Sequence, residues 1–128
     1  MELKRVVVTG LGALTPIGNS VEEYWKALLN GVSGAAEITH FDASKFKTRF
    51  ACEVKNFNPL DHIDRKEARK LDLYAQYAMV VAEEAMQDSG MDLEKINPDR
   101  AGVIWGSGIG GIKTFLDEAT NFASGDGT

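Results

Sequence analysis

Two short apolar segments, each followed by glycines, stand out in the hydrophobic pattern of the chain. Residues 6–9 are Val-Val-Val-Thr and run into Gly10-Leu-Gly12, and residues 101–105 are Ala-Gly-Val-Ile-Trp and run into a glycine-rich loop at 106–111. Short β-branched runs that end in glycine are typical of buried strands. The pattern therefore predicts one strand at 6–9 and another at 101–105.

The polar positions predict a first helix between these segments. Ser20 is followed three residues later by Glu23, the arrangement of a capping box at a helix start. The helix is expected over 20–30 and to end at Gly31. Farther on, residues 50–54 alternate weakly between apolar and polar, which indicates a possible further strand.

A long helix is predicted over 65–89, with Asp64 as its amino-terminal cap and Gly90 after its end. The middle of this segment is apolar on nearly all sides, which is typical of a helix covered by other elements. A last amphipathic helix is expected from Ile112 to Phe122.

The order strand, helix, possible strand, long helix, strand, helix predicts an α/β fold. So small a sheet cannot cover the apolar surface of the long helix. The chain is therefore expected to be part of a larger layered body, although a dimer could supply the same cover.

Composition restricts the class of protein. Of 128 residues, 44% are hydrophobic and 26% charged, which fits one soluble globular domain. No apolar run approaches a membrane span. The apolar run after the charged start is too short for a signal peptide, which predicts a cytoplasmic start. A net charge of -5 argues against nucleic-acid binding, and one cysteine excludes an internal disulfide framework.

The glycine loop is the first candidate site. Gly106, Gly108 and Gly111 fit G-x-G-x-x-G between a predicted strand and a predicted helix, the setting in which a dinucleotide's pyrophosphate rests on a helix start. The acid expected about 20 residues later would be Asp126, which lies between two glycines and not on a strand. A tight strand-to-helix turn is the favoured interpretation, with dinucleotide binding as the alternative.

A basic cluster is the second candidate. It consists of Arg65, Lys66, Arg69 and Lys70. From Asp64 to Lys70 there are four basic and two acidic residues on a chain that is acidic as a whole. From the residues alone, a solvated helix end is favoured over the docking of an acidic partner.

Cys52 is the third candidate. It lies mid-way along the possible strand and beside Glu53, whereas a nucleophilic thiol needs a helix start or a nearby histidine. A structural role is therefore predicted. His40 and His62 have no ligand spacing with each other or with Cys52 and are expected to be surface or loop residues, so no metal site is predicted.

Several motifs in one order connect the chain to a known family. They are Arg5-Val-Val-Val-Thr-Gly-Leu-Gly-Ala-Leu-Thr-Pro-Ile-Gly-Asn19, Tyr24-Trp-Lys-Ala-Leu-Leu29, His40-Phe-Asp42, Arg65-Lys-Glu67, Arg69-Lys70, Met86-Gln-Asp-Ser-Gly90 and Gly106-Ser-Gly-Ile-Gly-Gly111. Together they cover the whole chain, which resembles the amino-terminal part of the elongating β-ketoacyl-(acyl-carrier-protein) synthases, most closely the type II enzymes of bacterial fatty-acid elongation.

The resemblance implies a fold and an activity. The fold would be the thiolase fold, two α/β halves in α-β-α-β-α layers, with residues 1–128 as most of the first half and the nucleophile segment and second half outside it. Such proteins are homodimeric enzymes that condense an acyl thioester with malonyl-(acyl-carrier-protein) by decarboxylative Claisen condensation. The resemblance implies that this condensation needs no metal and no nicotinamide, and that acyl-carrier protein delivers the substrates on its phosphopantetheine arm.

The resemblance also implies roles for individual residues. The family's nucleophilic cysteine and two catalytic histidines lie in later segments, so no catalytic residue is expected in 1–128. Lys66, Arg69 and Lys70, with Arg65 adjacent, match positions that dock acyl-carrier protein. Gly108 and Ile109 match the acyl pocket, where the Ile109 position gates the channel.

Two other functions remain as alternatives. One is a non-catalytic carrier-protein-binding fragment or scaffold, and the other is the dinucleotide-binding α/β domain considered above.

Overall fold

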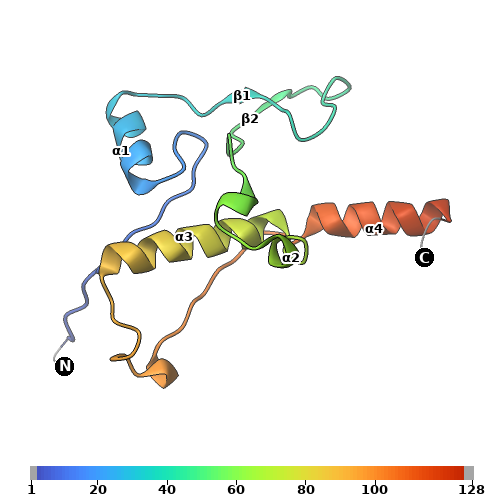
Figure 1. The fold of residues 1–128 in the computed structure, drawn as a ribbon. Coiled ribbons are helices and arrows are strands. Elements are labelled where there is room, and N and C mark those ends of the chain that lie inside the picture. Colours follow the sequence, from blue (N-terminus) through green and yellow to red (C-terminus); the bar gives the residue numbers. More distant parts are fainter. Residues whose placement is uncertain (1–2, 126–128) are drawn as a thin grey trace. The chain divides into compact units, whose positions relative to one another are not determined.

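A computed structural model describes residues 3–125. The chain divides into two compact units. The first unit comprises Met1–Asn58 with Val80–Met91, and the second comprises Pro59–Met79 with Asp92–Thr128. Figure 1 labels the α-helices and the two strands along the chain.

Helix α1, Val21–Leu29, begins the regular structure of the first unit, as predicted. The Ser20 hydroxyl accepts a hydrogen bond from the Glu23 amide at 3.2 Å. The Glu23 carboxylate reaches back to the amide of Asn19 and not of Ser20, one residue before the capping-box position. The helix ends before Gly31, whose φ of +64° suits glycine.

Within the described residues, the sheet is a single antiparallel pair of strands, β1 (Ala36–Glu37) and β2 (Phe50–Ala51). Ala36 pairs with Ala51, and Glu37 pairs with Phe50. The possible strand at 50–54 is thus confirmed for its first two residues only.

The predicted strand at 6–9 is wrong for this structure, because residues 6–9 belong to no strand. Val6, Val7 and Val8 are 88%, 66% and 78% exposed. A strand exists only where a neighbouring backbone supplies ladder hydrogen bonds, and the described part of the first unit offers this segment none.

The predicted long helix of the second unit is divided. It consists of α2, Arg65–Ala68, and α3, Leu73–Ser89, whose last part belongs to the first unit. Asp64 caps α2 through Lys66, and Gly90 follows α3 with a φ of +59°, so both predicted ends are confirmed. The break at 69–72 is a correction to the single helix expected over 65–89.

The Gln76 side chain explains how this break is tolerated. Its amide donates to the carbonyl oxygens of Ala68 at 2.9 Å and Leu71 at 3.0 Å. These carbonyls lie at and beyond the end of α2, where the helix leaves acceptors without intrahelical partners. A side chain one turn into α3 therefore replaces the backbone bonds of a continuous helix.

The second predicted strand, at 101–105, is also wrong for this structure. Residues 101–107 form no helix or strand, and Ile104 is fully exposed. The predicted last helix is confirmed as α4, Ile112–Ser124, closed by Gly125 in the left-handed conformation. Two 3-10 turns complete the chain, η1 at Pro59–Asp61 and η2 at Pro98–Arg100.

Few apolar side chains are buried. Among the described residues, the buried apolar side chains are Ala27, Ala43, Ile63, Ala68 and Val80. Contrary to the expectation of a covered helix, Val80 is the only residue of α3 in this group. The apolar side chains of α4 are exposed as well, including Phe115 at 70% and Phe122 at 80%. The chain itself thus leaves uncovered the apolar surface that its sequence predicts to be buried.

Candidate functional site

The basic cluster lies on α2 and the turn after it, in the second unit. Arg65 and Lys66 are in the helix, Arg69 is its carboxyl-terminal cap and Lys70 follows. All four residues are exposed. The Asp64 carboxylate accepts from the Lys66 amide at 2.8 Å, which fixes the start of the segment. The four cations are thus presented to solvent on one short, capped turn, which we call the docking turn (residues 65–70).

The glycine loop, residues 106–111, lies before α4. Gly108 and Ile109 are in bends, and the Ile109 side chain is 78% exposed. Gly110 has a φ of +77°, and its amide donates to the Ser107 hydroxyl oxygen at 3.3 Å. The described residues therefore present Ile109 to solvent and do not by themselves enclose it.

The amino terminus of α4 meets an acidic side chain. The Thr114 hydroxyl donates to Oδ1 of Asp72 at 2.5 Å. Gly111 lies so close to the same carboxylate that a Cβ on it would overlap the Asp72 oxygens. Sequence reasoning missed this contact because it placed Asp72 inside a continuous helix, and no local motif marks an acid that acts 42 residues away.

This contact removes the support for dinucleotide binding. No strand precedes the loop among the described residues, and a carboxylate lies at the helix start where a pyrophosphate would rest. Two anions at one helix terminus repel each other. The acid proposed for the ribose, Asp126, lies outside the described residues.

Cys52 is exposed and follows β2, so its expected place mid-way along a strand is wrong. The strand ends at Ala51, before the thiol. His40 and His62 are exposed, as predicted. Within residues 3–125, no three His, Cys, Asp or Glu side chains are grouped as metal ligands, and no helix has the length and apolarity to cross a membrane.

Glu53 is the best-connected carboxylate near Cys52. It accepts from the Thr39 amide at 3.0 Å, the Thr39 hydroxyl at 2.8 Å and the His40 amide at 3.3 Å, and His40 Nε2 lies 4.0 Å away. Desolvation acts to raise the pKa of Glu53, but these hydrogen bonds and the His40 charge together lower it below its ordinary value. Glu53 thus serves to anchor the 39–40 turn.

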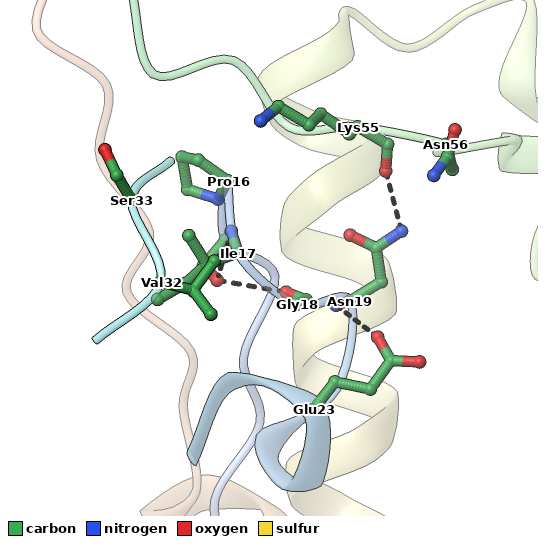
Figure 2. A pocket seen from close by; sticks show the side chains of 10 residues that line it. Pro16, Ile17, Gly18, Asn19, Glu23, Val32, Ser33, Lys55 and Asn56 are labelled. Atoms are coloured by element: carbon green, nitrogen blue, oxygen red, sulfur yellow. Dashed lines mark hydrogen bonds between the residues drawn. The ribbon is translucent and has the colours of Figure 1, made fainter. Parts of the chain in front are cut away.

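A pocket of about 290 Å³ lies in the first unit, between the 15–19 turn and residues 55–56 (Figure 2). Its polar groups bond to one another: the Asn19 side chain donates to the Lys55 carbonyl oxygen at 2.8 Å, and the Asn19 amide donates to Glu23. The two charged side chains in its lining are Glu23 and Lys55. The pocket is therefore a cavity whose lining residues do not form a recognisable set of catalytic groups.

The family follows from a match along nearly the whole chain. Residues 3–127 fit the model of the β-ketoacyl synthase amino-terminal domain. The chain belongs to this family. The resemblance found in the sequence motifs is therefore confirmed.

Curated relatives agree with this membership. The chain is 52% identical over 112 residues to 3-oxoacyl-(acyl-carrier-protein) synthase 2 of Staphylococcus aureus (strain COL), over 88% of this chain and 27% of that protein. It is 51% identical to the Vibrio harveyi protein of the same name over the same shares, and 45% identical to that of Synechocystis sp. (strain ATCC 27184 / PCC 6803 / Kazusa) over 94% of this chain and 29% of that protein. The chain thus spans between a quarter and a third of the length of these relatives.

Solved structures share the fold of this ketosynthase domain. The ishigamide ketosynthase/chain length factor matches with a TM-score of 0.71 at 33% identity, over 94% of this chain and 30% of that one. The AntDE:AntF assembly, a type II PKS acyl-carrier protein in complex with its ketosynthase, matches with a TM-score of 0.70 at 26% identity, over 94% and 31%. The chain accordingly has part of the α/β, thiolase-like fold of ketosynthases.

Proposed function

We propose that this ketosynthase domain is the amino-terminal part of a cytoplasmic, homodimeric enzyme of fatty-acid elongation. The enzyme condenses an acyl thioester with malonyl-(acyl-carrier-protein) by decarboxylative Claisen condensation, as a 3-oxoacyl-(acyl-carrier-protein) synthase II. The observation that carries the proposal is the family match over residues 3–127, supported by relatives of that name at 45–52% identity.

The catalytic groups of this reaction lie outside residues 1–128 in the proposal. The chemistry needs an activated thiolate and donors that polarise the thioester carbonyl. Cys52 is exposed and does not begin a helix, and the neighbouring carboxylate is that of Glu53, which lies 4.0 Å from His40 Nε2. The reaction uses no metal or nicotinamide cofactor, and substrates arrive on the phosphopantetheine arm of acyl-carrier protein.

We assign carrier docking to the docking turn. Arg65, Lys66, Arg69 and Lys70 are all exposed on a protein of net charge -5, which concentrates positive charge at one place. The solved neighbour AntDE:AntF is a ketosynthase held in complex with an acyl-carrier protein, which supports a carrier partner for this family. An acidic carrier would be steered to such a patch by charge.

We assign the acyl pocket to Gly108 and Ile109. Ile109 lies between two glycines, so its side chain has room to move in a loop without neighbouring Cβ atoms. Its exposure in residues 3–125 fits a pocket whose other walls come from elsewhere in the longer protein. In that protein, Ile109→Phe would narrow the channel and exclude long acyl chains while short primers remain usable.

Charge reversal on the docking turn tests the proposal. In the longer protein, Lys66→Glu with Arg69→Glu should raise the KM for carrier-bound substrate severalfold, since exposed pairs contribute about 0.2–1 kcal/mol each. Reaction with small thioester mimics should stay nearly unchanged. The matched control is Lys45→Glu with Lys47→Glu, which makes the same change of charge at exposed positions of the first unit.

The outcomes separate the alternatives. Equal loss of activity with carrier-bound and small substrates would mean that the fold was damaged. Equal loss of activity in the Lys45→Glu, Lys47→Glu control would mean that the net charge of the protein matters and not the docking turn. Carrier binding without any condensing activity in the longer protein would favour the scaffold. The 128-residue chain alone, incubated with acyl- and malonyl-carrier proteins, should give no product by mass spectrometry, and turnover abolished by Cys52→Ala would contradict the proposal.

A further inference from the structure

Asp72 stands between the two assigned sites of the second unit. It follows the docking turn by two residues, and its backbone carbonyl accepts from the amides of Ala75 at 2.9 Å and Gln76 at 3.0 Å. These bonds begin α3 and hold the Asp72 backbone. Its half-buried carboxylate is left to act elsewhere.

The carboxylate acts at the start of α4. The cap residue Gly111 has no side chain to satisfy the first amides of the helix, and Asp72 supplies negative charge at that end. Thr114 in the first turn of α4 donates to Asp72 Oδ1 at 2.5 Å. Gly111 permits this approach, because any Cβ there would overlap the carboxylate.

The glycine loop has little else to hold it. Two hydrogen bonds hold the loop locally, from the Gly110 amide to Ser107 and from the Ile112 amide to the Gly110 carbonyl oxygen at 2.9 Å, and the space where Cβ atoms would lie at Gly106, Gly108 and Gly110 is open. The contact of Asp72 with Gly111 and Thr114 is thus the main tether at the α4 end of the loop. Displacing Asp72 would release the segment that carries Ile109.

The docking turn is tied to the same place. Gln76 donates to the carbonyl oxygens of Ala68 and Leu71, which joins the end of α2 to the first turn of α3. Asp72 is the residue between these two helices. A continuous set of hydrogen bonds therefore runs from the docking turn, through Gln76 and Asp72, to Thr114.

We propose that Asp72 is a positioning residue that couples the docking turn to the loop carrying Ile109. Binding of the carrier protein at the docking turn then sets the position of the Ile109 side chain in the acyl channel. The proposal rests on the docking and pocket roles assigned above. Asp72 touches no substrate and acts only through the glycine loop. Coupling of this kind has to be shown by a measured interaction between the residues that carry it.

Amide exchange in the 128-residue chain tests the tether without any enzyme assay. Thr114→Val removes the donor at constant shape, and exchange at residues 110–112 should become about tenfold faster because a hydrogen bond to a charged group is lost. Thr114→Ser should restore the slow exchange. Asp117→Asn is the control, since it breaks the exposed Lys113–Asp117 pair on the same helix and leaves Asp72 alone.

A double-mutant cycle then separates coupling from simple damage. Asp72→Ala and Thr114→Val should each accelerate amide exchange at residues 110–112. The double variant should exchange no faster than the faster of the two single variants. Additive effects, or exchange unchanged in both single variants, would overturn the proposal. If Thr114→Val fails to fold, Asp72→Asn replaces it: the variant keeps an acceptor for Thr114 but loses the charge, so exchange should be faster than in wild type and slower than in Asp72→Ala, and unchanged exchange would overturn the proposal.

The longer protein tests the consequence. Thr114→Val should shift the kcat/KM ratio of long over short carrier-bound acyl chains by about tenfold, with Thr114→Ser and Asp117→Asn unchanged. A shift with Ile109→Phe but none with Thr114→Val would overturn the coupling and leave the assigned pocket standing. A shift with Thr114→Val but none with Ile109→Phe would overturn the route through Ile109, and no shift with either would overturn both.

Discussion

Two glycine-bearing loops of this chain share a sequence pattern and differ in structure. Each follows a short β-branched segment and precedes a helix, and neither preceding segment forms a strand. The loop at 10–19 is packed on α3, with Gly10 and Gly12 against its backbone. The loop at 106–111 has open space at most of its glycines and one tether, at Asp72.

The difference comes from the carboxylates that reach each loop. Glu84 of α3 accepts from the amides of Ala13 at 2.7 Å and Val21 at 2.8 Å, and Asp88 accepts from Leu11 at 2.8 Å. Two amides of the first loop, and the amide of Val21 at the start of α1, are thus bonded to carboxylates of α3. Carboxylates of α3 hold the first loop, and the glycines let its backbone approach the helix closely.

Gly12→Ala should have the largest effect on this contrast. A Cβ at Gly12 would overlap the Val81 carbonyl oxygen, which is backbone and cannot rotate away. Local stability should fall by about 3 kcal/mol, the upper part of the range for overpacking. Amide exchange at Ala13 measures the loss.

Gly106→Ala is the matched control in the second loop. Its Cβ would enter open space, so stability should be unchanged or rise by up to about 1 kcal/mol through the restricted unfolded chain. Equal losses at Gly12 and Gly106 would show that the two loops are not packed differently.

Glu84→Ala should have the next largest effect, about 2 kcal/mol, because two amides lose a charged acceptor in a half-buried place. Exchange at Ala13 and Val21 should accelerate together. The neighbour Glu83 is exposed and bonds only weakly to Gln87 at 3.3 Å, so Glu83→Ala is the control. An unchanged exchange rate of the Ala13 amide in Glu84→Ala would show that the Glu84 carboxylate does not hold the first loop.

Acidification should give the smallest effect, at the 39–40 turn held by Glu53. The folded-state pKa of Glu53 is lowered, so its contribution to stability is complete above the ordinary carboxyl pKa and is lost as pH falls through the folded value. Protection of the Thr39 and His40 amides should therefore decline in that acidic window.

Glu53→Gln should remove this pH dependence, whereas Glu37→Gln at an exposed position of β1 should keep it. Protection that rises on acidification, or that declines equally in Glu53→Gln, would contradict the assignment. The carboxylate would then hold the turn at 39–40 by shape and not by charge.

The candidate site could be predicted in part. The exposed basic cluster and the glycine loop are short, contiguous motifs, so the sequence indicated both. The tether between Asp72 and Thr114 could not be predicted, because it joins residues far apart in the chain and depends on the break after α2. The Gln76 side chain that bridges this break carries no recognisable signal.

The sequence by itself determined the family of the chain, the starts of α1 and α2 and the end of α3. Ser20, Asp64 and Gly90 act on amides and carbonyls within a few residues, so local chemistry is sufficient. Only the tertiary structure decided that residues 6–9 and 101–105 form no strand. A strand needs hydrogen bonds from another backbone, and β-branched residues indicate only that a segment favours the strand conformation.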